Sequence, residues 1–154
     1  MLKMKTLIAK IKSLKIFTLS GSPESIAKGF ALGSFIGMMP VPGFQVFIAL
    51  FFSSSLGVNK KAACLAVFNT NAITGVFIFA FNYWLGKTLL GIDNDFIFPN
   101  QIDFSFFKII LLAGKDVMLS LLMGGLVTGL SSSLIIYYGI LRYYKRKLKI
   151  HGDI

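Results

Sequence analysis

Residues 22–45, SPESIAKGFALGSFIGMMPVPGFQ, start a helix and then break it, and this decides the fold. Ser can cap a helix, Pro suits its first position, and Glu is favourable near the positive end of the helix dipole. Pro40, Pro42 and Gly43 then end any straight helix, because they remove donors and clash with the previous turn. The stretch predicts two half-helices, roughly 24–39 and 43–58, each about 22 Å long at 1.5 Å per residue. Neither half comfortably crosses a bilayer alone.

Three segments around this break contain no Asp, Glu, Lys or Arg: residues 29–59, 62–86 and 117–141. Hydrophobic residues make up 55% of the 154-residue chain and charged residues only 14%, against about 25% charged in soluble domains. A transmembrane helix needs about 20 apolar residues, so the second and third segments each suit one span. We therefore expect an all-α integral membrane bundle, and the composition argues against a water-soluble fold.

The charged residues are mostly cationic, with 16 Lys+Arg against 6 Asp+Glu and a net charge of +10. Cations gather before residue 29, at Lys60 and Lys61, and after residue 141, whereas residues 87–116 hold three Lys and four Asp. The positive-inside rule then predicts a multi-pass protein with both termini in the cytoplasm. With both termini on the same side, the number of membrane crossings must be even. This favours a re-entrant hairpin at about 24–58 and transmembrane helices at about 60–88 and 115–145. Two short full crossings in place of the hairpin also satisfy the count.

The chain divides into a basic N-terminal segment at 1–20, one membrane domain at 21–145 and a basic tail at 146–154. In the first segment, apolar residues recur at helical spacing among lysines, at Met4, Leu7, Ile8, Ile11 and Leu14. This pattern is typical of an amphipathic helix that lies on the anionic inner leaflet of a lipid bilayer. A basic tail that only fixes the topology fits the pattern equally well.

Two stripes of small residues predict helix packing. The first half-helix carries Gly29, Gly33 and Gly37 on one face, and the last span carries Gly125, Gly129 and Ser133. In lipid such stripes let two backbones approach closely. We expect the two stripes to contact each other, or either stripe to contact its copy in a second chain. A cleft for a substrate is the alternative.

The break also predicts a polar site, because free carbonyls of one half-helix meet free N–H groups of the next. Transporters use broken helices in this way to hold ions or anionic groups. Uncharged polar residues gather at a similar depth in 62–86, and Asn82 shares a helical face with two of them. The candidate binding residues are Pro40, Pro42, Gly43, Gln45, Asn69, Asn71 and Thr74. The structural alternative is that Gln45 satisfies the turn and the asparagines cap the hairpin.

Taken with Asn59 and NTNAITGVFIFAFNYWLG at 69–86, the opening stretch resembles the bacterial membrane family known as domain of unknown function 2062. The matching positions are Ser22, Pro23, Glu24, Ala27, Gly29, Gly33, Gly37, Pro40, Pro42, Gly43, Gln45, Asn59, Asn71, Thr74 and Gly86. Ala72 departs from the pattern, because the family usually has Pro at this position. The kink that the resemblance implies for this helix would depend on that Pro. The resemblance implies no assigned activity. Some relatives are joined to glycosyltransferase-like domains, which hints at envelope or lipid-linked sugar metabolism.

The leading hypothesis is a small bacterial inner-membrane protein that binds or translocates an anionic lipid or small anionic solute at the broken hairpin. We expect a homo-oligomer, because about two full spans are too thin to enclose a pathway. The alternative is a membrane scaffold without transport, which docks a partner such as an envelope glycosyltransferase.

Enzymatic chemistry is not expected. One Cys, Cys64, and one His, His151, exclude a disulfide framework and a Cys/His zinc site, so we expect no metal and no cofactor. Lys115 and Asp116 form no acid–base pair with the loop acids at a recognisable spacing. Nucleic acid is not an expected partner either, because the basic residues lie at membrane ends, where topology explains them.

Overall fold

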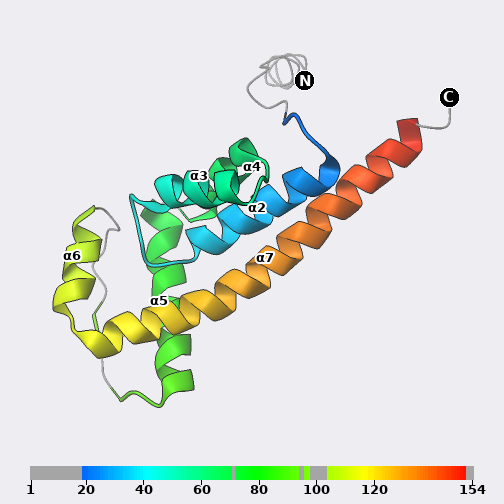
Figure 1. Cartoon of the computed structure of the whole chain (residues 1–154). Coiled ribbons are helices and arrows are strands. Elements are labelled where there is room, and N and C mark those ends of the chain that lie inside the picture. Colours follow the sequence, from blue (N-terminus) through cyan, green and yellow to red (C-terminus); the bar gives the residue numbers. More distant parts are fainter. Residues whose placement is uncertain (1–18, 71, 94–95, 98–103, 152–154) are drawn as a thin grey trace, which may run out of the picture.

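The computed structural model describes residues 19–70, 72–93, 96–97 and 104–151, and within these ranges every regular element is a helix (Figure 1). This confirms the predicted all-α class. The elements are α2 (Pro23–Gly37), α3 (Gln45–Ser55), α4 (Lys60–Ala66), the 3-10 helix η2 (Val67–Asn69), α5 (Ala72–Leu90), α6 (Phe104–Leu112) and α7 (Lys115–His151). The predicted amphipathic helix of the N-terminal segment falls on residues 1–18, outside the described residues.

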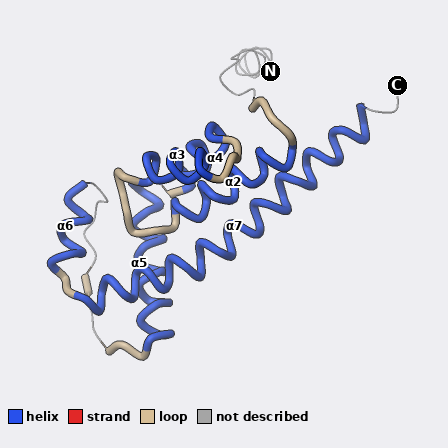
Figure 2. Tube along the Cα trace, viewed as in Figure 1, coloured by secondary structure: helices blue, strands red, loops and turns tan. Residues whose placement is uncertain are grey.

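The predicted start and break of the first helix are both present. Ser22 Oγ accepts a hydrogen bond from Ser25 N at 3.2 Å, and Pro23 occupies the first turn of α2. The chain leaves the helix after Gly37 and starts α3 at Gln45, with a loop between them that Figure 2 shows in tan. Gly43 has a φ of 85°, a left-handed conformation that favours glycine. The two half-helices are therefore 15 and 11 residues long.

Helix α2 lies at the centre, with α7 along one side and α3 and α4 on the other (Figure 1). It runs antiparallel to α7, because Phe35 lies against Gly129 while Met38 lies against Gly125. It runs parallel to α4 and η2. Helix α5 crosses α7 near Gly124, and α6 packs on the first turns of α7. The start of α2, the start of α4 and the end of α7 thus share one end of the molecule.

Two apolar cores hold these layers. One joins α2, α3, α4 and η2 through Ile36, Ala49, Ala63 and Val67. The other joins α5, α6 and α7 through Phe79, Tyr83, Ile110, Val117 and Leu121. The first core consists of small and medium side chains between closely spaced helices, whereas the second contains two large aromatic rings.

One described helix is long and apolar enough to cross a membrane, namely α7 over Lys115–Arg146. This agrees with the span predicted at 115–145. The other predicted span, 60–88, is not one straight helix, because the axes of Lys60–Asn69 and Thr74–Leu90 are bent by 80°. At Thr70 the backbone is extended, with φ −110° and ψ 113°, and its hydroxyl donates to Gly37 O instead of to its own helix. The bent pair counts as a second span only if both halves form one crossing.

Candidate functional site

The end of α2 is capped by side chains from the following helices. Thr70 Oγ1 donates to Gly37 O at 2.6 Å, and Asn82 Nδ2 donates to Met38 O at 3.0 Å. The last carbonyls of a helix have no partner within the helix and are costly to bury unpaired. One hydroxyl, from Thr70, and one amide, from Asn82, therefore cap the end of α2, although both residues are more than 30 positions away in the sequence.

Asn69 links this cap to α7. Its Nδ2 donates to Ser34 Oγ at 3.0 Å, and its Oδ1 accepts from Thr70 Oγ1 at 3.1 Å. Ser34 Oγ in turn lies 2.5 Å from Ser132 Oγ, where either atom can donate. The network thus connects η2, α2 and α7 through side chains only.

Asn82 is the most buried amide in this region, with no exposed surface. Besides its bond to Met38 O, its Oδ1 accepts from Thr128 Oγ1 at 2.8 Å. Sequence reasoning noted Asn82 only as sharing a face with Asn71 and did not single out Ser34. An amide within a charge-free run is the signal for such a residue, because an unpaired amide is costly in an apolar environment.

Gln45 differs from these asparagines. It is the first residue of α3, and the preceding Phe44 supplies no side-chain cap. Its Oε1 is buried and accepts no hydrogen bond from any described residue. An unpaired buried acceptor costs about 1–3 kcal/mol, so a hydrogen-bond donor at this position would be stabilising.

The remaining predicted site residues are placed as follows. Pro40 and Pro42 are buried in the break, whereas Gly43 is exposed. Thr74 has an exposed side chain on the first turns of α5, and Asn71 lies outside the described residues. The structure therefore brings Asn69 to the end of α2 with Thr70 and Asn82, where it bonds to the side chains of Ser34 and Thr70.

The two glycine stripes do not contact each other, so that predicted pairing is wrong. Gly29, Gly33 and Gly37 face α4 and η2, where an added Cβ at Gly33 would overlap the backbone of Ala63. Alanines of α4 form the opposing small surface at Ala62, Ala63 and Ala66. Gly125 and Gly129 instead face Met38 and Phe35, on the other side of α2. Ser133 lines a groove beside Lys28 and Tyr137.

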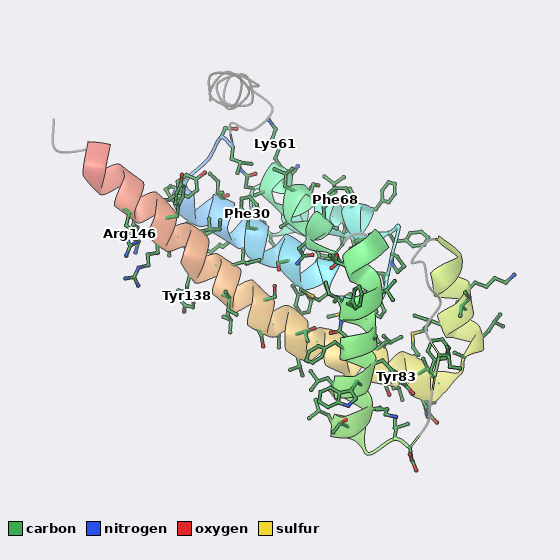
Figure 3. All side chains as sticks on the ribbon, turned by 180° about the vertical axis from the view of Figure 1, so that it is seen from behind. Phe30, Lys61, Phe68, Tyr83, Tyr138 and Arg146 are labelled. Atoms are coloured by element: carbon green, nitrogen blue, oxygen red, sulfur yellow. The ribbon has the colours of Figure 1, made fainter. Side chains whose placement is uncertain are left out.

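Cations gather at the end of the molecule where α2 and α4 begin and α7 ends. In Figure 3 Lys61 and Arg146 lie toward this end, whereas Tyr83 lies at the other. Lys28 Nζ donates to Glu24 Oε1 at 2.8 Å on the surface of α2. The hydrogen bond from Lys28 and its positive charge hold the pKa of Glu24 below its ordinary value, and Lys145 acts in the same direction. The described part of this end therefore carries more positive than negative charge.

Comparison with known proteins gives one match. A protein-family model described as "Uncharacterized protein conserved in bacteria (DUF2062)" matches residues 8–151. No curated protein and no solved structure matches the chain. Within the described residues, no three His, Cys, Asp or Glu side chains lie close enough together to hold a metal ion.

Proposed function

The chain belongs to the bacterial family DUF2062, and from this premise we propose that it is an inner-membrane protein that binds or translocates an anionic lipid or small anionic solute. The observation that carries the proposal is the buried Gln45 Oε1 at the break, which accepts no bond from the described residues. The carbonyls at the end of α2 are already capped, so the polar group that a ligand would satisfy lies on the α3 side of the break.

The chemistry of this position favours one class of ligand. Gln45 Oε1 needs a donor, whereas the start of an α-helix favours negative charge through its N–H groups and dipole. A phosphate that also carries a hydroxyl offers both, because its oxygens accept and its hydroxyl donates. Polyol phosphates, either as lipid headgroups or as free solutes, fit this description.

The arrangement of the helices supports a membrane location with the basic end in the cytoplasm. Asn59 N donates to Ser25 O at 3.2 Å, so the chain after α3 returns to the level at which α2 begins. A re-entrant hairpin requires this return. Helix α3 also exposes Phe47 and Phe51, by 71% and 67%, as a lipid-facing helix does.

Vesicle assays test the ligand. Vesicles that contain the wild-type protein should take up labelled glycerol phosphate, or exchange a labelled anionic lipid between leaflets, faster than empty vesicles. Gln45→Leu should abolish this difference while leaving the melting temperature unchanged or raised, because it removes an unpaired polar atom. Ser54→Ala, an exposed change on the same helix, is the matched control and should leave the activity intact. Equal rates in wild-type and empty vesicles for both probes would contradict the proposal.

Cysteine labelling tests the topology. In a Cys64→Ala background, which removes the chain's one cysteine, Lys61→Cys should react with a membrane-impermeant reagent only from the cytoplasmic side. The same should hold for Gly57→Cys after α3, since both positions are exposed. Labelling of either residue from outside would contradict the re-entrant hairpin and two short crossings alike, and would favour a single broken crossing over 24–58.

The scaffold is the second candidate, and the capped break favours it. Thr70 and Asn82 hold the end of α2 without a ligand, as a purely structural hairpin would need. Large apolar side chains such as Phe77, which is 74% exposed, suit a helical partner such as an envelope glycosyltransferase. Crosslinking in cells should then recover a stoichiometric heterologous partner that is lost on Phe77→Ala. Recovery of the chain alone, as a homo-oligomer, would contradict the scaffold.

A further inference from the structure

A groove of about 490 Å³ lies between α2 and α7 near the basic end of the molecule, and we call it the α2–α7 groove. Its volume falls within the ~300–1000 Å³ of ligand-binding pockets. The floor is apolar and consists of Ala31, Leu32, Leu56, Val58 and Leu134. Lys28, Ser133 and Tyr137 complete the lining. An apolar floor with a cation beside it matches a molecule that has an anionic head and a hydrocarbon tail.

We propose that the α2–α7 groove holds one acyl chain of an anionic phospholipid, with the phosphate beside Lys28. This inference rests on the proposed function only for the membrane location. Lys28 lies in the first half of α2 and Leu32 just past its middle, whereas Gln45 lies beyond its end, so the two sites are separate.

The charges at the groove favour a phosphate. Lys28 gives one hydrogen bond to Glu24, and an ammonium group has three donors, so further bonds are free for a headgroup. The pair is open to the surroundings, with side chains 51% and 60% exposed. The carboxylate of Glu24 opposes an anion, but Lys145 of α7 also lies close enough to lower the pKa of Glu24, so that two cations, Lys28 and Lys145, accompany it. The cations therefore outnumber the one acid.

The aromatic residues of α7 place the groove at the level of lipid phosphates. Tyr137 lines the groove, and Tyr138 and Tyr143 follow it along α7, exposed by 64% and 61%. Tyrosines concentrate at the membrane–water interface, where their hydroxyls reach the headgroups. The stem of Lys28 can run along apolar surface and keep its ammonium group at the same level. A tail that starts there would extend along Leu32 and Leu134 toward the membrane interior.

Charge also opposes two other occupants. The N-terminal residues 1–18 contain five lysines and no acid, so like charges oppose their docking beside Lys28. A second copy of the chain related by two-fold symmetry would bring the same basic surface against itself. An anionic amphiphile lacks this repulsion.

Native mass spectrometry of the full chain in detergent tests the lipid. Phosphatidylglycerol should remain bound at one molecule per chain, about tenfold more tightly than phosphatidylcholine with the same acyl chains. Free glycerol phosphate at equal concentration should not displace the lipid, because it lacks the tail. Equal retention of the two lipids, or displacement by glycerol phosphate, would overturn the proposal.

Matched variants locate the binding. Ser133→Phe fills the groove and should reduce retention of phosphatidylglycerol at least about tenfold, whereas Ser131→Phe, on the exposed face of the same helix, should not. Lys28→Gln tests the headgroup without adding bulk and should weaken retention several-fold, whereas Lys61→Gln removes a charge at the same end outside the groove and should not.

The outcomes separate this site from the break. Ser133→Phe and Lys28→Gln should each reduce retention of phosphatidylglycerol in a Gln45→Leu background as they do in the wild type, so the groove site survives even if the vesicle activity fails. Loss of retention in Gln45→Leu with no effect of Ser133→Phe or Lys28→Gln would overturn the groove. A Ser133→Phe chain that dissociates from a dimer and keeps its lipid would assign the groove to a second copy instead.

Discussion

Two close helix contacts of this protein use glycine in different ways. Along the α2–α4 contact, Gly29 and Gly33 face three alanines of α4, and Gly37 continues the stripe against η2, so the two segments stay close over several turns. At the α5–α7 crossing, each helix contributes one glycine: Gly86 faces the backbone of Ser120, and Gly124 faces the backbone of Asn82. A parallel contact needs a repeated small residue, whereas a crossing needs one small residue on each helix.

This difference explains which contact is visible in the sequence. A repeat of every four residues is a pattern, so the stripe on α2 could be predicted. A single glycine in each of two distant segments has no period, and nothing in the sequence pairs Gly86 with Ser120.

The largest expected effect comes from breaking the parallel contact. Gly33→Leu places a branched side chain against the backbone of Ala63, which cannot yield, and should destabilise the fold by at least about 3 kcal/mol. Gly139→Leu is the matched control, since nothing lies within 4 Å of an added Cβ there. Melting temperature in detergent measures both. Similar melting temperatures for the two variants would show that α2 and α4 do not pack as described.

The crossing should be the next most sensitive contact. Asn82→Leu removes the donor to Met38 O and the acceptor for Thr128 Oγ1, and should lower the unfolding free energy by about 1–3 kcal/mol. Thr88→Val changes a hydroxyl on the same helix that bonds only to Trp84 O at an exposed position, and should change the stability by less than about 0.5 kcal/mol. If Asn82→Leu left the unfolding free energy unchanged, the hydrogen bond that caps α2 would contribute nothing to stability.

A smaller effect is expected where the parallel contact begins. Asn59 Oδ1 accepts from Ala62 N at 2.9 Å as the cap of α4, and its Nδ2 donates to Ser20 O at 2.7 Å. Asn59→Ala should cost about 1 kcal/mol, and Asn59→Asp should recover the cap but not the bond to Ser20. Thermal unfolding of the three proteins separates the two bonds. Equal losses in both variants would show that only the bond to Ser20 matters.

The smallest effect concerns the exposed pair Glu24–Lys28. The pKa of Glu24 is lowered by Lys28, so its contribution to stability is present above the ordinary glutamate pKa and is lost as the pH falls through its lowered value. The pKa of Lys28 is raised, so its contribution is lost as the pH rises through that raised value. Near neutral pH, Glu24→Gln should lower the melting temperature slightly, and the difference from wild type should vanish in acid. A difference that grows in acid would contradict the assignment.

The sequence predicts local features of this fold better than distant contacts. Ser22, Pro23 and the Pro/Gly break act within a few residues, and each has the predicted local effect. The single helix predicted at 60–88 is instead two helices bent by 80°, and Thr70 at the bend bonds to Gly37 O, 33 positions earlier. The alanines of α4 that face the stripe on α2 are equally visible in the sequence, but their partner depends on the path of the chain. The candidate site divides in the same way: Asn69 could be found from its residue type, and Ser34 could not.

The double contact of α2 also sets an order of events during synthesis. Its glycine face meets α4 soon after the hairpin is made, whereas Ser34 and Ser132, which meet across its other face, are 98 positions apart. Contacts between residues so distant in sequence form late. The hairpin and α4 can therefore assemble while the ribosome is still adding the last helix. Before α7 is made, the hydroxyl of Ser34 can bond only to Asn69 of these two partners, and the bond to Ser132 forms afterwards.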